Sequence, residues 1–257
     1  MRMKPFDGNA LLKFLPKNAG AHNSIYRGED ITNLFYDGTL SNQIEAGTFD
    51  DIFVGDYIIG QNSGRKYLIA ELDYRLHTGD TECTTHHVLM IPEKSMGTAK
   101  MNDSNTSTGA YANSKMHTQY LEPFKTIINN DFGTNHVLTH REYFQNAVTN
   151  GYSNSGAWYS SDIELMNEIM VYGSNIFNNI INGTSIPDFY TVNKTQLALF
   201  RYRPDLIVAE DDIGAKVSYW LRDVVSGTAF ANIASFGVPL YLNASTQIGV
   251  RPAFLLY

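Results

Sequence analysis

The sequence predicts an α+β protein in which a mixed, mainly antiparallel sheet carries packed helices. Three patterns along the chain predict this fold class. Short strand-like runs come first, between residues 51 and 91. Helix-like patterns occupy the middle, from about residue 114 to residue 177, and short strands return from residue 218 onward. Strands at both ends with helices between them favour an antiparallel sheet with the helices packed to one side.

Residues 1–50 differ in texture from the rest of the chain. Prolines and glycines interrupt residues 5–20 repeatedly, and the apolar run between them is short. We therefore expect an extended N-terminal arm that lies on another surface, since such a segment has no core of its own. A short helix is expected within it, from Thr39 to Ala46, ended by Gly47.

The first strands follow this arm. Residues 52–59 and 66–74 read as two strands joined by a turn at 61–64, which has the polar and glycine residues that turns prefer. Residues 87–91 form a continuous apolar run, which predicts a buried strand ended by Pro92.

The middle of the chain predicts three helices. The first begins near Ser114, and Pro123 must kink or split it. Residues 139–142 and 161–164 each match a capping box, in which a hydroxyl and a carboxylate satisfy free helix amides. Helices are expected after both boxes. The remaining segments are expected to be loops at 97–114 and 150–160, and strands at 218–224, 229–234, 240–242 and 249–257.

Composition limits the classes of function. The hydrophobic fraction of 43% and the charged fraction of 18% are those of a folded protein. A net charge of -7 without a basic cluster argues against a nucleic-acid partner. No apolar run has the length of a signal peptide or a membrane span, so we expect synthesis in a cytoplasm and no membrane insertion. The single Cys83 is expected to be a structural thiol.

Catalytic patterns are weak. His86–His87 with His117, or His136 with His140, could be considered as zinc ligands, but His136 precedes the expected helix and no Glu-flanked motif is present. We expect His87 and His140 to be hydrogen-bonded to the backbone at the edge of the core. The sequence therefore predicts no enzyme, no cofactor and no metal.

One enzymatic alternative stays open. Glycosidases act through two carboxylates, and acidic pairs occur at Asp50–Asp51 and at Glu210–Asp212. The second group reads more simply as a solvated turn before Ile213 and Gly214.

The C-terminal part of the chain carries a specific pattern. Tyr219–Asp223, with the letters Y-W-L-R-D, and Gly249–Phe254, with G-V-R-P-A-F, resemble the W-L-R … G-V-R-P-A signature of a prophage-encoded structural protein family. That family is similar to the C-type lectin-like fold of formylglycine-generating enzymes and of the phage major tropism determinant. Further segments resemble uncharacterised phage structural proteins, at 21–28, 47–57, 73–80, 138–141, 156–159 and 164–173.

The resemblance implies a virion protein of a phage that infects Gram-positive bacteria. Residues 1–50 would attach to the particle, and residues 51–257 would form a C-type lectin-like domain. The implied partners are other virion proteins, copies of the same chain in a homo-oligomer such as a trimer, and a host-surface glycan or protein. Alternatives are a capsid or tail decoration protein without a ligand, and a cell-wall-degrading hydrolase of the tail.

In the tropism determinant, the segment between the Trp-containing strand and the last strand displays variable side chains to the host. Tyr and Phe suit recognition because they give rigid contact area, while Asn and Ser give adaptable hydrogen bonds. The alternative is that these residues cap a sheet edge or contact a neighbouring subunit. Carried onto this chain, the candidate receptor-binding residues are Asn232, Ser235, Phe236, Val238, Tyr241, Asn243, Ser245 and Gln247.

Two departures from the related proteins restrict what is carried over. With Cys83 alone, the chain lacks the reactive cysteine pair of formylglycine-generating enzymes. Glu122–Phe124 lacks the amide of the Glu-Pro-Asn loop of calcium-dependent lectins, so calcium and sugar binding by that route are not expected.

Three further residues are expected to be structural: Trp220, Arg222 and Arg251. Both arginines lie in strands among apolar neighbours, where an unpaired charge is costly. We expect each guanidinium to be held by a carboxylate or by backbone carbonyls, with Asp223 or Asp73 as partners. The Trp-Leu-Arg and Gly-Val-Arg-Pro strands are expected to belong to one sheet.

Overall fold

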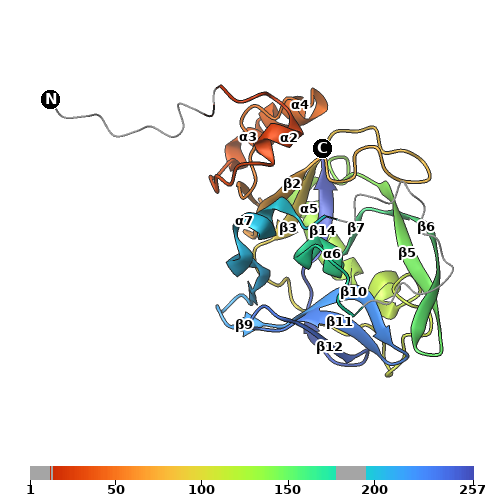
Figure 1. Ribbon diagram of the computed structural model, residues 1–257. Coiled ribbons are helices and arrows are strands. Elements are labelled where there is room, and N and C mark those ends of the chain that lie inside the picture. The colour runs from red at the N-terminus through yellow and green to blue at the C-terminus, as the bar shows by residue number, and fades with distance from the viewer. Residues whose placement is uncertain (1–11, 13, 178–194) are drawn as a thin grey trace.

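The computed structural model describes residues 12, 14–177 and 195–257. Strands form two five-stranded sheets and two two-stranded ones in this part of the chain (Figure 1). Pairing between the strands of these sheets is antiparallel except for one contact between β10 and β13, and few helices cover the sheets. The α+β class predicted from the sequence is confirmed, although several sheets replace the expected single sheet.

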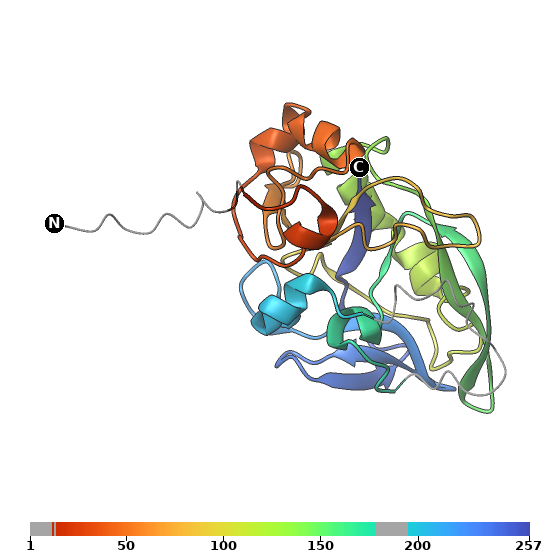
Figure 2. The ribbon, with the colours of Figure 1, turned by 45° about the horizontal axis from the view of Figure 1, so that its top comes forward.

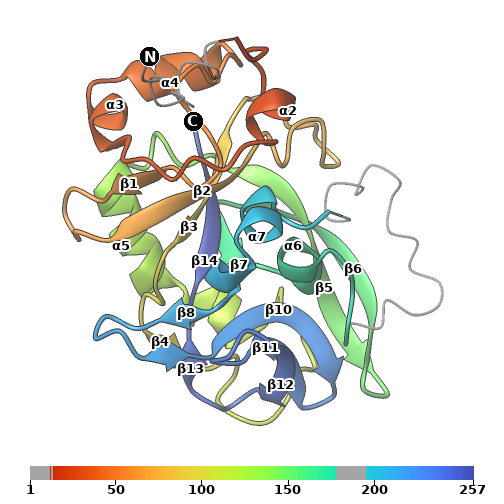
Figure 3. The same ribbon diagram turned by 60° about the vertical axis from the view of Figure 1, so that its left-hand side comes forward.

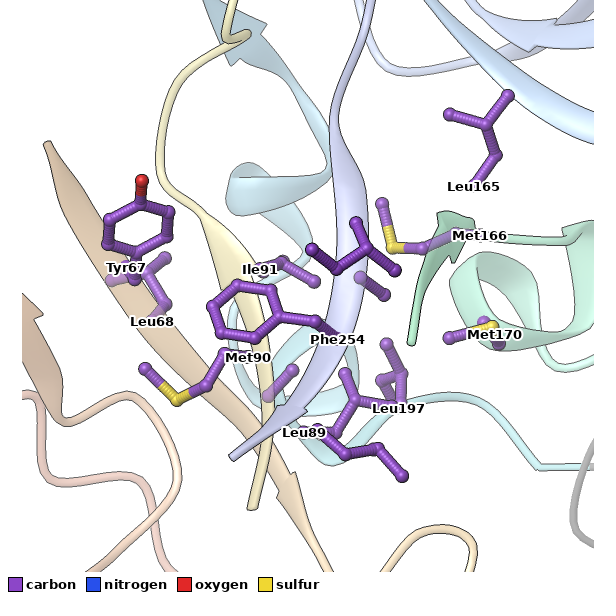
Figure 4. Close-up of a cluster of buried hydrophobic side chains, with 14 of the residues drawn as sticks. Tyr67, Leu68, Leu89, Met90, Ile91, Leu165, Met166, Met170, Leu197 and Phe254 are labelled. Carbon is purple, nitrogen blue, oxygen red and sulfur yellow. The ribbon is translucent and has the colours of Figure 1, made fainter. Parts of the chain in front are cut away.

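The first sheet has the order β1-β2-β3-β14-β7. Its strands β3, β7 and β14 are buried along their whole length, which explains why residues 87–91 read as a continuous apolar run. Figure 4 shows how Met90, Ile91 and Phe254 meet in its core. The strands are β1 Tyr57–Ile59, β2 Lys66–Leu72, β3 Val88–Pro92, β7 Ile163–Leu165 and β14 Pro252–Leu256.

The second sheet has the order β12-β11-β10-β13-β4, so β12 is an edge strand (Figure 3). The strands are β4 Thr98–Ala99, β10 Tyr219–Ser226, β11 Ala229–Ile233, β12 Pro239–Asn243 and β13 Ile248–Gly249. The expected strands at 218–224, 229–234 and 240–242 are confirmed.

The expectation of one sheet for both signature segments is wrong. Trp220 lies in β10 of the second sheet, whereas Pro252 begins β14 of the first. Gly249 still pairs with Tyr219. The chain therefore passes from one sheet to the other within the signature itself, at residues 250–251.

A long hairpin replaces the helix expected after residue 139 and the loop expected at 150–160. It consists of β5 His140–Thr149 and β6 Tyr152–Ser161 (Figure 1). Asn150 and Gly151 both have positive φ, at 54° and 83°. Two positive φ values in succession suit the tight turns that join antiparallel strands, and Asn-Gly is the sequence that favours them. This turn signal outweighed the capping-box pattern.

The second capping box is also wrong as a helix start. Ser161 and Glu164 do interact through their side chains, but Glu164 lies in β7. The helix α6, Glu168–Tyr172, begins later, where the Asn167 side chain accepts a hydrogen bond from Met170 N at 2.8 Å.

The remaining central elements follow the prediction more closely. A π-helical turn η1, Met116–Tyr120, precedes α5, Glu122–Phe132. Pro123 lies in the first turn of α5, so it divides the two as expected. Helix α7, Ala198–Tyr202, leads into the turn η3, Pro204–Ile207, and into the hairpin of β8, Ala209–Glu210, and β9, Lys216–Val217.

Residues 19–45 form three helices near the C-terminal end of β14 (Figure 2). They are α2 Ala19–His22, α3 Thr32–Tyr36 and α4 Thr39–Glu45, and α4 confirms the helix expected there. Leu40 and Ile44 are buried in the same core cluster as the first sheet. These residues are therefore a packed layer and not an extended arm; residues 1–11 lie outside the described part, and the domain boundary at residue 50 stays a prediction.

Candidate functional site

The hairpin of β11 and β12 positions most of the candidate receptor-binding residues. Its turn is closed by hydrogen bonds from Ala234 N to Val238 O and from Gly237 N to Ala234 O, both 2.9 Å. Gly237 has a φ of 86°, and a Cβ there would meet Val208 Cγ2 at 3.0 Å. Phe236 is therefore carried at the tip of a tight turn that requires glycine next to it.

Seven of the eight candidate residues reach the surface. Phe236, Tyr241 and Val238 are 66%, 55% and 39% exposed. Asn243 and Gln247 are exposed, and Ser235 and Ser245 are half-buried. Asn232 is different, since it is 1% exposed and pairs in register with Leu240. Its side chain cannot contact a partner at this surface.

The surface has an unusual composition. None of residues 224–250 is Asp, Glu, Lys, Arg or His. Within that run, Phe236, Val238, Leu240 and Tyr241 are all exposed large apolar residues. Single exposed apolar side chains are ordinary, but four of them within six residues at one sheet edge favour an interaction site. We call residues 235–247 the β12 surface. The buried candidate Asn232 is not part of it.

Neighbouring segments hold the β12 surface in place. Ser245 Oγ donates to Asn105 Oδ1 at 2.6 Å, and Gln247 Nε2 donates to Thr98 Oγ1 at 2.9 Å. The ring of Tyr241 meets that of Phe177 edge to face, with centroids 5.5 Å apart. Contacts from three separate segments give the surface the pre-organisation that favours binding.

A hollow of about 570 Å³ adjoins the end of the β12 surface. Tyr120 and Phe124 give it aromatic area, while Gln119 and Lys100 give it polar groups. Gln247 belongs to both the hollow and the β12 surface. The hollow is open to solvent and adds contact area at the end of the β12 surface.

Trp220 and Arg251 lie where they fix the scaffold. Trp220 is fully buried and donates from Nε1 to Ala99 O at 2.9 Å, which ties β10 to β4. Arg251 is also fully buried; its Nε donates to Pro92 O at 2.9 Å and its Nη1 to Leu206 O at 2.8 Å. Backbone carbonyls thus bind Arg251, as expected from the sequence.

Arg222 belongs to a group of buried charges that the sequence did not reveal. We call Arg75, His140, Glu142, Glu164 and Arg222 the buried charge cluster; each is 5% exposed or less. Arg75 Nη2 lies 2.5 Å from Glu142 Oε2, and Arg222 Nη2 lies 3.1 Å from Glu142 Oε1. His140 Nε2 lies 3.3 Å from Glu164 Oε1. The cluster joins β5, β7 and β10 to the segment after β2.

The partners named for the two arginines were wrong. Asp223 Oδ2 accepts a hydrogen bond from Glu168 N at 2.7 Å and so fixes the start of α6. Asp73 accepts from His86 and from His87 N. A carboxylate does bind Arg222, but it comes from Glu142, which lies 80 residues away in sequence.

The cluster sets the protonation of its members. Burial alone would lower the pKa of His140, but Glu164 and Glu142 outweigh it and raise that pKa to about 9. Burial would raise the pKa of both glutamates, yet Arg75, Arg222 and His140 hold the pKa of Glu142 well below its usual range. His140 lowers that of Glu164. The group is therefore a set of ion pairs at neutral pH.

His140, Glu142 and Glu164 each offer a ligand atom, and these atoms lie within 4.8 Å of one another. That spacing would suit a metal ion, but the residues around it do not. Arg75 and Arg222 already occupy the two oxygens of Glu142, and Ser161 Oγ donates to Glu164. A dication would add charge to a buried group that already holds two guanidinium ions, which is costly. We interpret the cluster as structural.

The other histidines and acids have local roles. His87 contacts Thr85 O through Nδ1 at 2.8 Å and accepts from Arg75 N at 2.9 Å, so its expected backbone bonding is confirmed. Burial lowers the pKa of His87 to about 3. For His140 the same expectation was wrong, because it faces carboxylates.

The acids at 210–212 form a turn. Asp211 Oδ1 accepts from Ile213 N at 3.1 Å and from Ala215 N at 2.8 Å. Asp212 Oδ2 lies 2.9 Å from Arg65 Nη2. Asp211 and Asp212 therefore each have a structural partner, as the interpretation of this segment as a turn predicts, whereas Glu210 ends strand β8.

Comparisons with protein-family models, curated proteins and solved structures find no match for this chain. Among the described residues, no helix is both long and apolar enough to cross a membrane. A function for this chain must therefore come from what its surface and interior can do.

Proposed function

We propose that this chain is a bacteriophage virion structural protein that binds a host-surface glycan or protein through the β12 surface. One observation carries the proposal: Phe236, Val238, Leu240 and Tyr241 are exposed together in a run of residues that has no charge. Exposed apolar groups of this kind mark sites of interaction with other molecules. The phage origin itself comes from the resemblance of the signature segments.

The chemistry of the surface supports binding and not catalysis. Tyr241 is the one residue of the β12 surface with a titratable side chain, so the surface offers contact area and hydrogen bonds but no acid–base pair. The ionised groups of the buried charge cluster are inaccessible to a substrate. Aromatic rings beside Asn, Ser and Gln are the residue types of adaptable binding surfaces.

The lectin-like domain of residues 51–257 is part of the same proposal. The last strand, β14, returns to pair with β3, so the first strands and the last strand of the proposed domain belong to one sheet. The segment between β10 and β14 contains the buried strand β11 and, at the edge of the second sheet, β12 with the β12 surface. Copies of the chain on one particle would add avidity to weak single contacts.

Binding to cells tests the proposal. Purified protein should sediment with bacteria that the phage infects and not with resistant ones. Phe236→Ser combined with Tyr241→Ser should reduce the bound fraction at least tenfold. Ile213→Ser is the matched control, because Ile213 is 91% exposed on the β8–β9 turn, outside the surface. That variant should bind like the parent.

Other outcomes separate the alternatives. Absence of cell binding, together with antibody labelling of the capsid or tail in intact particles, would support a decoration protein without a ligand. Clearing of a cell-wall suspension that Asp211→Ala and Asp212→Ala abolish would support a hydrolase. Equal binding by the parent and the Phe236/Tyr241 variant would refute the assignment of the site.

A further inference from the structure

The outer edge of β12 has no pairing partner among the described residues, where its single neighbour is β11. Proteins normally protect such edges with charged residues, proline, bulges or a covering segment. Here Pro239 begins the strand, but no residue of β12 is charged. The exposed edge is therefore open to pairing with another strand.

The hydrogen bonds of the hairpin show which backbone groups point outward. Val238 O accepts from Ala234 N, and Ala244 N donates to Thr228 O, each at 2.9 Å. Even-numbered positions therefore direct their backbone groups toward β11. Because the two sides of a strand alternate, the odd-numbered positions of β12 direct theirs to the open edge.

The outward set consists of Pro239, Tyr241 and Asn243. Proline has no N–H, so Pro239 offers a carbonyl alone. Asn243 O already accepts a hydrogen bond from Thr246 N at 2.9 Å, so Asn243 offers its N–H. Tyr241 offers both a donor and an acceptor. The edge thus presents two donors and two acceptors. When two such edges run antiparallel, each donor of one faces an acceptor of the other.

We propose that β12 pairs antiparallel with β12 of a second copy of this chain, about a twofold axis at Tyr241. The two Tyr241 residues then exchange N–H···O bonds, and each Asn243 N–H donates to Pro239 O of the other copy. All the outward groups then have hydrogen-bond partners. Pro239 has no N–H to donate, but the group opposite it is the carbonyl of Asn243 in the other copy, which already accepts from Thr246 N.

Side chains and charge favour a copy of the same chain over another partner. In this register Leu240 faces Leu242 of the second copy, which places apolar residues directly opposite each other. The chain carries a net charge of -7, which opposes self-association on most of its surface. The uncharged run at 224–250 is a face on which two copies meet without bringing like charges together.

The pairing goes beyond the proposed host binding and does not depend on it. Side chains on a strand stand roughly perpendicular to the sheet, so pairing through the backbone leaves the Tyr241 ring on the face of the sheet. Phe236 remains at the tip of its turn. A dimer would present two β12 surfaces together, which favours avidity.

Sedimentation of the full-length protein over concentrations on the order of 1–300 µM tests the pairing, since small interfaces associate in this range. The parent chain should be a monomer–dimer equilibrium. Tyr241→Pro removes an outward N–H that makes no hydrogen bond within the described part of the chain, and it should raise the dimer dissociation constant at least 100-fold. Tyr241→Ala keeps that N–H, so it should retain the dimer.

Paired charge variants give a second test that does not involve proline. Leu240→Lys with Leu242→Lys places like charges opposite each other in the dimer and should give a monomer. Leu240→Lys with Leu242→Glu places opposite charges there and should keep the dimer. Both variants carry two substitutions at the same positions, so each places a charge at Leu242, which is half-buried against the core.

Cross-linking tests the register. In a Cys83→Ser background, Tyr241→Cys should form a disulfide between copies, because paired residues lie about 5.5 Å apart between Cα atoms, within disulfide reach. Leu240→Cys alone should not form a disulfide, because Leu240 of one copy is offset by two residues along the strand from Leu240 of the other. This offset puts their Cα atoms about 8 Å apart, which is beyond disulfide reach.

Two results would overturn the pairing: a parent protein that stays monomeric at the highest concentration, or a dimer that Tyr241→Pro and the double-lysine variant leave intact. Cell binding serves as the independent measurement. If the dimer forms as described but no cells are bound, the pairing stands and the proposed function fails.

Discussion

The buried charge cluster and the β12 surface invert the usual distribution of residues. Inside the protein, β5, β7 and β10 bring ionised side chains together at 5% exposure or less. Outside, β12 displays apolar side chains in a run without charge. The difference lies in where each group finds its partner. The interior charges are paired within the chain, whereas Phe236, Val238 and Leu240 leave apolar side chains exposed to solvent, so another molecule is expected there.

The largest expected effect comes from removing one ion-pair partner from the buried charge cluster. Arg222→Met leaves Glu142 with one guanidinium partner fewer at a site that water does not reach. Removing one member of a buried ion pair costs about 3–5 kcal/mol because the other charge stays buried. We expect the free energy of unfolding, measured with chemical denaturant, to fall by that amount.

Arg141→Met is the matched control for this change. Arg141 is the neighbour of Glu142 in sequence and pairs with Asp80 at 2.7 Å, but both side chains are partly exposed. Such a pair contributes about 0–1 kcal/mol. If Arg222→Met and Arg141→Met lower the free energy of unfolding equally, the ion pairs of the buried charge cluster do not stabilise the fold more than an exposed pair does.

The second prediction uses pH to sharpen the comparison. The folded-state pKa of His140 is raised from 6.5 to about 9. Its contribution is therefore complete below pH 6.5 and is lost as the pH rises through 9. At about 1.4 kcal/mol per pKa unit, the loss is on the order of 3 kcal/mol.

The variant His140→Gln isolates this contribution, because other groups also titrate in alkali. The unfolding free energy of the parent should fall between pH 6.5 and 9.5 more steeply than that of His140→Gln. Parallel curves for the two proteins over this range would contradict the assignment of a charged His140.

Glu71 gives an effect of similar size, but here it is the ionised form of the side chain that destabilises the folded state. Glu71 Oε2 accepts from Ala198 N at 2.8 Å, and burial raises the pKa of this carboxyl to about 7. The folded state thus favours the neutral form, so Glu71 costs stability as the pH rises from 4.5 through 7. Glu71→Gln keeps an acceptor for Ala198, and it should raise the unfolding free energy at pH 8 by about 3 kcal/mol.

The same measurement at pH 4.5 is the control for Glu71→Gln. Both proteins carry a neutral side chain there, so their stabilities should be close. A gain of equal size at both pH values would assign the effect to packing and not to charge.

Local patterns predicted the C-terminal strands because each is short, apolar and bounded by glycine or proline. The same reasoning missed β5 and β6. Residues 139–142 satisfy a capping box, while the alternate burial of His140, Glu142 and Phe144 indicates a strand, and the Asn150–Gly151 turn indicates a hairpin. Weighing that turn above the box would have found the hairpin.

The site was less predictable than the fold. Most of the β12 surface follows from residue type, but the burial of Asn232 depends on its register with Leu240, which a single sequence does not fix. The buried charge cluster depends on contacts between distant segments: Arg222 and Glu142 are 80 residues apart. No spacing in the sequence links them.

The smallest expected effect lies on the other side of the comparison. Phe236 is 66% exposed, so Phe236→Ser should change the unfolding free energy by less than about 0.5 kcal/mol. Phe230→Ala, in the paired strand of the same hairpin, is the contrast, because Phe230 is fully buried and its loss should cost about 3–5 kcal/mol. A Phe236 variant that folds as stably as the parent but loses binding would show that this ring is kept for a partner and not for the fold. A large loss of stability would instead show that Phe236 packs against other residues of this chain. No separate binding partner would then be needed to explain its position.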